Sequence, residues 1–384
     1  MELEDQAYVV AIGVDITPDN SEERIVTAQI IIPSKLAGGA SGGGEGKSFY
    51  QVSVRDKSVF AGLDKMEAVV SRRISLLQCK AILMSEEYAS SSIAAMVRVA
   101  SRHPQLRRNI FIAVVPGSAR EFLEKNQPKL TVNITRYWED ISKANKYTGF
   151  TSFSNLQTIV EGLESPGENS VITMAAVGES SPEDRPPQSA QAGQLPRAGG
   201  TKGEFVGNAV FRGDKMVGKM GDIESKMLSM LRGEWRSGPF SVPAPNDPKN
   251  SIGLTLRQET SPKVTVDLES EPIRIDIKLK LSGSLVSEFG SVDYTVGEQR
   301  KNLENSAREE IEKQASALIA RAQNEFDSDI FRFGNTGVKK KFLTWKEWED
   351  FKWHDKFPQV DIQVTAEVNI SQFGFENAPA TVKH

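Results

Sequence analysis

The chain has 384 residues, more than one ordinary domain holds, so we expect two or three domains. With 39% hydrophobic and 26% charged residues, the composition is that of a folded globular protein and excludes a disordered or fibrous chain. The net charge of -4, from 47 basic and 51 acidic residues, offers no basic face, so we expect no nucleic acid partner.

Residues 1–150 predict an N-terminal α/β domain. Strands at 7–16 and 24–32 flank the turn-forming Thr17-Pro18-Asp19-Asn20 and indicate a hairpin. A glycine-rich loop at 38–46, a strand at 49–54 and a helix over 58–74 follow. The order then alternates, which indicates a sheet covered by helices: strand 81–84, helix 86–100, strand 109–115 and helix 118–125.

Residues 151–245 predict a small middle α/β domain. The segment 178–200 is rich in Ser, Pro, Gly, Gln and Ala, and we expect it to be a mobile loop because it buries little apolar surface. The proline-rich segment 241–245 is interpreted as a linker. The regular elements expected in this domain are helix 156–163, strand 171–177, strand 205–211 and helix 222–232.

Residues 246–384 predict a C-terminal α+β domain. Strands are expected at 252–258, 263–268 and 273–281, and the third alternates strictly between apolar and polar residues. The longest helix, 298–327, carries an apolar stripe and would be about 45 Å long. A shorter helix at 345–353 and a closing strand at 360–370 complete the prediction. The fold class is therefore mixed α/β or α+β, with three domains that each hold a mostly antiparallel or mixed sheet flanked by helices.

The most tempting catalytic motif is Gly46-Lys47-Ser48, which imitates the end of a phosphate-binding P-loop. A P-loop must lead directly into a helix, whereas residues 49–54 predict a strand. Ser41 also stands where the first glycine of that motif is required. We interpret the segment as a surface loop and expect no nucleotide cofactor.

Other catalytic and metal-binding groups are sparse. The single cysteine, Cys79, allows no intrachain disulfide and predicts a buried small residue. The histidines His103, His354 and His384 lie too far apart to place two ligands on one helical face. Carboxylate pairs such as Asp327 with Asp329, or Glu309 with Glu310, are interpreted as solvated helix faces. We therefore expect no catalytic residue, no metal ligand and no cofactor.

An aromatic cluster near the C-terminus is the candidate binding surface. Its spacing favours packing onto a sheet, but a ligand pocket or a partner surface remains open. The residues selected as a candidate partner or ligand surface are Phe331, Phe333, Trp345, Trp348 and Trp353.

Four phrases, spread in order along nearly the whole chain, together resemble the Ger(x)C family of spore germination proteins. The third of these motifs begins with Gly-Asn-Ala-Val-Phe, and the fourth, Asp-Ile-Phe-Arg-Phe-Gly, is the most specific of the four. In this sequence they occupy 3–15, 71–89, 207–218 and 329–334, the last followed by Trp345-Lys346, Trp353 and Phe357-Pro358.

The resemblance implies a non-catalytic lipoprotein, the C subunit of a nutrient germinant receptor. Such a subunit would be lipid-anchored on the outer face of the spore inner membrane and would act with membrane-embedded A and B subunits. Family members carry a signal peptide and a lipidated cysteine before the first phrase, and we expect both to precede Leu3 in the natural protein.

Two alternatives stay open. An extracellular protein that captures a small nutrient would be favoured by a pocket lined by Trp345, Trp348 or Phe331. An enzyme acting on nucleotides or the cell wall would require polar groups that converge in a cleft.

Overall fold

The computed structural model describes residues 5–33, 48–131, 133–185, 187–287, 292, 294 and 297–372. It separates into two compact units where the sequence predicted three domains. The first unit holds residues 1–145, 150–165 and 169–222, and the second holds residues 146–149, 166–168 and 223–384.

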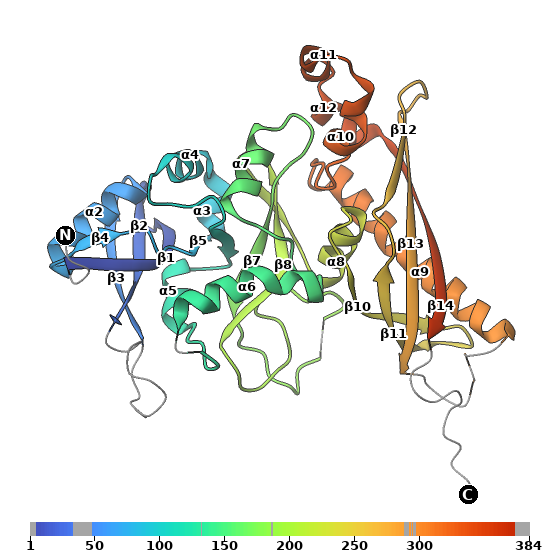
Figure 1. Cartoon of the computed structure of the whole chain (residues 1–384), viewed down its shortest axis with the longest axis horizontal. Helices are drawn as coiled ribbons and strands as arrows, with labels where there is room; N and C mark the ends of the chain where they lie inside the picture. Colours follow the sequence, from blue (N-terminus) through green and yellow to red (C-terminus); the bar gives the residue numbers. More distant parts are fainter. Residues whose placement is uncertain are drawn as a thin grey trace, which may run out of the picture. The chain divides into compact units, whose positions relative to one another are not determined.

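The first unit is built on one mixed sheet, shown from blue to yellow-green in Figure 1. In the described residues the strand order is β3-β2-β1-β5-β6-β7-β8-β9, with the short β4 beside β1. Strands β1, β5, β6 and β7 are parallel, whereas β2, β3, β8 and β9 join antiparallel. The bounds are β1 Gln6–Thr17, β2 Asn20–Ile31, β3 Phe49–Asp56, β4 Arg73–Ser75, β5 Ala81–Ser85, β6 Phe111–Val115, β7 Val171–Val177, β8 Gly203–Arg212 and β9 Lys215–Met220.

Helices cover both faces of this sheet, as the alternating sequence predicted. Every residue of β5 and β6 is buried, because side chains on both faces meet helices. One apolar cluster joins α2, α3, α4 and α7 to one face, and a second joins α5 and α6 to the other. The bounds are α2 Val59–Val70, α3 Glu86–Ser91, α4 Ala94–Arg102, α5 Ala119–Lys125, α6 Ile134–Thr148 and α7 Leu156–Glu164.

Two local features differ from the sequence prediction. The helix expected over 86–100 is broken at Ser92, whose backbone is extended and whose hydroxyl bonds the Asp214 carboxylate. The Ile93 N–H donates to the Asp214 carbonyl at 2.9 Å, so the β8–β9 turn satisfies the backbone at the break. Helix α6, with the fully buried Trp138 on its sheet-facing side, was not predicted.

Both strands expected in the middle domain belong to the first sheet. Strands β7, β8 and β9 continue the first sheet, because β7 pairs in parallel with β6. The proline-rich linker prediction is wrong: residues 241–244 belong to strand β10, Ser237–Ala244. Strand β10 lies at the edge of the second sheet and pairs only with β11 among the described strands. An edge strand tolerates Pro239 and Pro243 because one side of its backbone has no partner strand to receive N–H groups.

The segment predicted to be a mobile loop, 178–200, contains neither helix nor strand in its described part and is held by two carboxylates. Glu204, buried on β8, accepts hydrogen bonds from the N–H groups of Gly193 at 2.8 Å and Leu195 at 3.4 Å, and it pairs with Arg197 at 2.7 Å. Asp222 accepts from the Ala190 N–H at 2.8 Å. These contacts fix the path of the loop, and its mobility stays a prediction.

The second unit contains a five-stranded sheet in its described part, with order β10-β11-β13-β12 and β14 beside β13. The predicted alternation in β13 is confirmed, since Ile275, Ile277, Leu279 and Leu281 are all buried. Strand β14 runs parallel to β13, and α9 connects the two strands. The bounds are β11 Asp247–Gln258, β12 Lys263–Asp267, β13 Arg274–Ser287, β14 Asp361–Gln372, α8 Asp222–Leu231 and α9 Gly297–Asn324.

Helix α9 packs its apolar stripe on one face of this sheet and also reaches its edge. The predicted stripe is confirmed, and its buried residues are Leu303, Ala307, Ile311, Leu318 and Ala322. Two of its glutamates accept hydrogen bonds from the backbone of β14: Glu312 from the Ala366 N–H at 2.8 Å and Glu304 from the Ile370 N–H at 2.9 Å.

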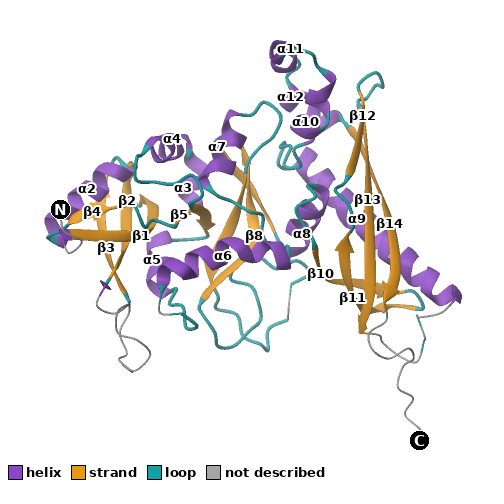
Figure 2. Cartoon of the chain, in the orientation of Figure 1, coloured by secondary structure: helices purple, strands orange, loops and turns teal. Residues whose placement is uncertain are grey.

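Between α9 and β14 the chain forms a small cap of short helices, which Figure 2 shows in purple beyond the end of α9. The cap packs on the sheet at Gly337, where an added Cβ atom would lie 2.9 Å from the Val266 side chain of β12. The bounds are α10 Phe333–Thr336, η2 Val338–Lys341, α11 Trp345–Asp350, α12 Trp353–Lys356 and η3 Phe357–Gln359.

Candidate functional site

The chain after α9 turns tightly around the carboxylate of Asp329, which is buried. One carboxylate oxygen, Oδ1, accepts hydrogen bonds from the N–H groups of Phe331 at 3.0 Å and Phe333 at 3.3 Å. The other, Oδ2, accepts from the Gly334 N–H at 2.9 Å and from the Trp353 indole at 2.8 Å. Burial raises the pKa of the Asp329 carboxyl above its ordinary value, while the four donors act in the opposite direction. The interpretation of Asp329 as part of a solvated helix face is wrong.

Two arginines complete this turn. Arg332 adopts a left-handed backbone conformation, with φ of 67°, and its guanidinium pairs with Glu168 at 2.9 Å and Glu234 at 2.7 Å. Arg232 is buried, and its Nε donates to the Ile330 carbonyl at 2.7 Å. Desolvation lowers the pKa of Arg232 to about 10. We call residues 328–334 the Asp329 turn. The polar groups described above all hold this turn in place.

Four of the five aromatic residues selected as a candidate surface lie inside the second unit. Phe331 and Phe333 stack with ring centroids 4.9 Å apart, and Trp353 meets Phe357 edge-on at 5.9 Å. Their exposed fractions are 2% for Phe331 and 1% each for Phe333, Trp348 and Trp353. They are packed in the core around the Asp329 turn, and a ligand or partner role for them stays a prediction.

Trp345 is the exception, with 51% of its surface exposed at the start of α11. The Lys339 ammonium lies 4.5 Å from the centre of its ring, in a cation–π contact. Leu343, two residues earlier in the chain, is 96% exposed. We call residues 339–346 the Lys–Trp loop; it is the exposed part of the predicted site.

The remaining sequence candidates have structural roles or lie outside the described residues. Gly46 and Lys47 are not described, but the strand predicted after them is confirmed as β3. His103 stacks on Phe60 at 5.3 Å, and burial lowers its pKa. Cys79 is buried, as predicted, which raises its thiol pKa to about 12. His384 lies outside the described residues. Across the part of the chain that is described, no group of three or more His, Cys, Asp or Glu residues could hold a metal ion.

The carboxylate of Asp15, near the end of β1, is also buried. The sequence indicated no role for it and included it only in the family motif at 3–15. Asp15 accepts hydrogen bonds from the N–H groups of Ala119 at 2.7 Å and Arg120 at 3.0 Å, at the start of α5. Asp15 thus stabilises a helix N-terminus, where a negative charge is favourable. Burial raises the pKa of its carboxyl.

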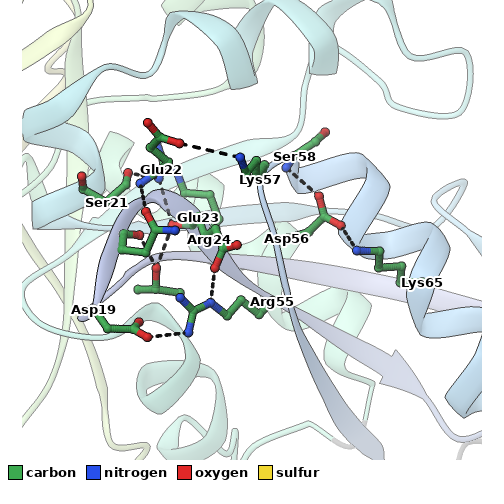
Figure 3. Close-up of polar contacts among 12 residues, drawn as sticks. Asp19, Ser21, Glu22, Glu23, Arg24, Arg55, Asp56, Lys57, Ser58 and Lys65 are labelled. Atoms are coloured by element: carbon green, nitrogen blue, oxygen red, sulfur yellow. Dashed lines mark hydrogen bonds and ion pairs between the residues drawn. The ribbon is translucent and has the colours of Figure 1, made fainter.

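A network of surface charges surrounds the end of the β1–β2 hairpin (Figure 3). Arg55 on β3 pairs with Asp19 at 2.8 Å and with Glu23, which raises the pKa of its guanidinium. Lys65 of α2 pairs with Asp56 at 2.5 Å. Each cation meets a carboxylate across neighbouring elements, so this network fixes the hairpin turn and presents no converging acid and base.

Both halves of the chain match spore germination families. The profile described as "Spore germination protein N-terminal domain" matches residues 1–177, and the one described as "Spore germination B3/ GerAC like, C-terminal" matches residues 206–374. The border between the two matches falls between β7 and β8, inside the first sheet.

Curated relatives are similar over almost the full length. The putative spore germination protein YfkR of Bacillus subtilis (strain 168) is 21% identical over 381 residues, which cover 97% of this chain and 91% of the relative. Spore germination protein KC of the same organism is 23% identical and covers 100% and 93%. Spore germination protein GerQC of Bacillus cereus is 21% identical and covers 87% and 85%.

One solved structure has a similar fold. The crystal structure of the GerBC protein aligns with a TM-score of 0.53 at 16% identity, over 94% of this chain and 96% of that one. Among the described residues, no helix combines the length and the apolar run that crossing a bilayer requires.

Proposed function

Because the chain belongs to the Ger(x)C family of spore germination proteins, we propose that it is the lipid-anchored C subunit of a nutrient germinant receptor. The observation that carries the proposal is the match of both halves of the chain to spore germination profiles, in the order that the family has. The subunit would lie on the outer face of the spore inner membrane and act with membrane-embedded A and B subunits when nutrients trigger germination.

A non-catalytic role is supported by how the chain uses two of its buried carboxylates, those of Asp329 and Asp15. Asp329 accepts four hydrogen bonds and Asp15 accepts two from backbone N–H groups and one from the Ser118 hydroxyl at 3.2 Å. A general acid or base must face the group whose proton it moves. Both carboxylates instead face the protein's own donors, so they act as structural anchors.

Membrane fractionation of spores tests this function. The full-length protein, followed by an antibody, should stay with the inner membrane and be released by detergent. Replacement of the expected lipidated cysteine by alanine should release it without detergent. From detergent extracts the protein should copurify with the A and B subunits. A natural protein that is freely soluble in the cytoplasm would contradict the proposal and return attention to an enzyme.

Capture of a small nutrient remains the second candidate, although Trp348 and Phe331, two of the residues expected to line its pocket, are buried. A cavity of about 510 Å³ in the first unit, between α4 and α7, is the feature that favours it. Arg98 and Arg102 line it beside Glu164 and Asp214. Guanidinium groups bind carboxylates such as those of amino acid nutrients. Saturable binding of an amino acid in calorimetry, lost in Arg98→Gln, would support this candidate; no heat with any nutrient that germinates the spores would oppose it.

A further inference from the structure

The Lys–Trp loop, residues 339–346, combines bare apolar side chains with unpaired cations. Leu343 is 96% exposed and Trp345 is 51% exposed. Lys340, Lys341 and Lys346 are exposed, and none forms an ion pair within the part of the chain that is described. An exposed leucine and an exposed tryptophan two residues apart need an explanation beyond chance, because a folded domain gains by burying them.

The fold holds this arrangement in place. Phe342, half-buried, packs on Trp348 and Phe351 with ring centroids 5.7 and 4.9 Å away. Its backbone is extended, with φ of -103° and ψ of 142°, so the next side chain, Leu343, points to the opposite side. The Glu347 carboxylate accepts from the N–H groups of Leu343 and Thr344, both at 3.1 Å, in a capping box. The loop is therefore built to present Leu343 outward.

The charges around the loop select the chemistry of its partner. Residues 339–346 contain four lysines and no carboxylate. The neighbouring α11 adds Glu347, Glu349 and Asp350, but over 338–356 six lysines still exceed four carboxylates, in a chain whose net charge is -4. Protein interfaces are depleted in lysine, whereas lysine and tryptophan both concentrate at the surface of a bilayer. A negatively charged lipid surface matches this composition better than a protein does.

We propose that the Lys–Trp loop binds the surface of a bilayer containing anionic phospholipids. Trp345 and Leu343 enter the headgroup region, and the lysines contact lipid phosphates. This inference deepens the proposed function, on which its biological setting rests: beside one covalent lipid anchor, a basic patch supplies a second membrane contact, and it sets which side of the second unit faces the membrane.

The test uses the 384-residue chain and sedimentation with vesicles. We expect binding to vesicles of phosphatidylglycerol and phosphatidylcholine and no binding to phosphatidylcholine alone. Vesicles with brominated acyl chains should quench the fluorescence of Trp345. The other four tryptophans are too buried to meet the bromine atoms, since Trp138, Trp235, Trp348 and Trp353 are each no more than 2% exposed. The fluorescence thus reports on the loop itself.

Variants separate the loop from general adhesion. Replacement of Lys340, Lys341 and Lys346 by Gln should lower the partition coefficient by about two orders of magnitude, and Leu343→Ser should lower it as well. Matched controls are Lys249, Lys263 and Lys301 replaced by Gln, and Leu130→Ser, whose leucine is 101% exposed in the first unit. The controls should bind like the natural chain.

Three results would overturn the proposal: no binding to anionic vesicles, binding without quenching, or equal losses in the loop and control variants. Loop-dependent binding to an acidic protein without vesicle binding would assign the loop to a protein partner instead. Each of these leaves the anchored receptor subunit untouched, because spore fractionation of the lipidated protein tests that function separately.

Discussion

Removing the carboxylate of Asp329 is the sharpest test of how the second unit is held together. Asp329→Ala leaves four buried donors without an acceptor, namely the N–H groups of Phe331, Phe333 and Gly334 and the Trp353 indole. A hydrogen bond to a charged group contributes about 1.5–3 kcal/mol. The relief of carboxylate desolvation and the entry of water offset part of the sum. We therefore expect a loss of about 3–5 kcal/mol, as when one partner is removed from a buried charged contact.

The conservative variant divides this effect. Each oxygen of Asp329 accepts two hydrogen bonds, so Asp329→Asn keeps one oxygen and should strand two donors. We expect about half of the loss seen in Asp329→Ala. Asp350→Ala, on an exposed position of α11, is the control and should change stability by less than about 0.5 kcal/mol.

Denaturant unfolding followed by tryptophan fluorescence measures these differences. Of the five tryptophans only Trp138 lies in the first unit, so the signal is dominated by the unit that contains Asp329. A separate transition of the first unit should stay in place in all three variants. If Asp329→Ala unfolds within about 1 kcal/mol of the natural chain, the carboxylate does not hold the turn and our reasoning is refuted.

Three further predictions concern single positions. The thiol of Cys79 should resist alkylation at pH 8 until the chain unfolds. Its pKa is about 12 in the folded chain and about 8.5 in the unfolded chain, so above pH 8.5 the free energy of unfolding should fall by about 1.4 kcal/mol per pH unit. The Cys79→Ala variant should lose this contribution to the pH dependence. Gly334→Ala places a Cβ 2.4 Å from the Gly167 carbonyl oxygen and should cost about 2–3 kcal/mol in denaturant unfolding. Glu204→Ala should speed amide hydrogen exchange at Gly193 and Leu195 while leaving the amides of β7 protected.

Each of these has its own counter-result. Rapid labelling of Cys79 in the folded chain would mean that the thiol is not enclosed. Gly213→Ala is the control for Gly334, because nothing lies within 4 Å of its Cβ position and only its φ of 57° adds a small strain; equal losses would remove the steric argument. For the segment 178–200, Glu179→Ala is the control and should leave amide hydrogen exchange at Gly193 and Leu195 unchanged. If these amides stay protected in Glu204→Ala, other contacts fix the segment.

Elements with a strong local pattern could be predicted from the sequence. The alternation of β13 and the stripe of α9 appear where expected, since each repeats one periodicity over many residues. The division into domains could not be predicted, because nothing local indicates that β7 pairs with β6 rather than starting a new sheet. Strand β10 was hidden by its prolines, which only an edge position tolerates.

The candidate site shows the same limit. Asp329 stands two residues after Asp327, and only the tertiary fold brings the Trp353 indole to its carboxylate from 24 residues further along. The aromatic spacing could not single out Trp345 as the residue whose ring stays exposed while Trp348 and Trp353 are buried. Exposure depends on what the neighbouring elements cover, and no period in the sequence encodes it.

The glutamates of α9 also limit how the second unit can assemble with other proteins. An edge strand normally offers a row of N–H groups on which another chain can add a strand. On β14 two of these groups are already satisfied by Glu304 and Glu312, and on β10 prolines replace two more. Strand addition at these two edges, whether by a partner subunit or by a second misfolded copy, is therefore discouraged. Recognition at these two edges must therefore rely on side chains rather than on strand addition.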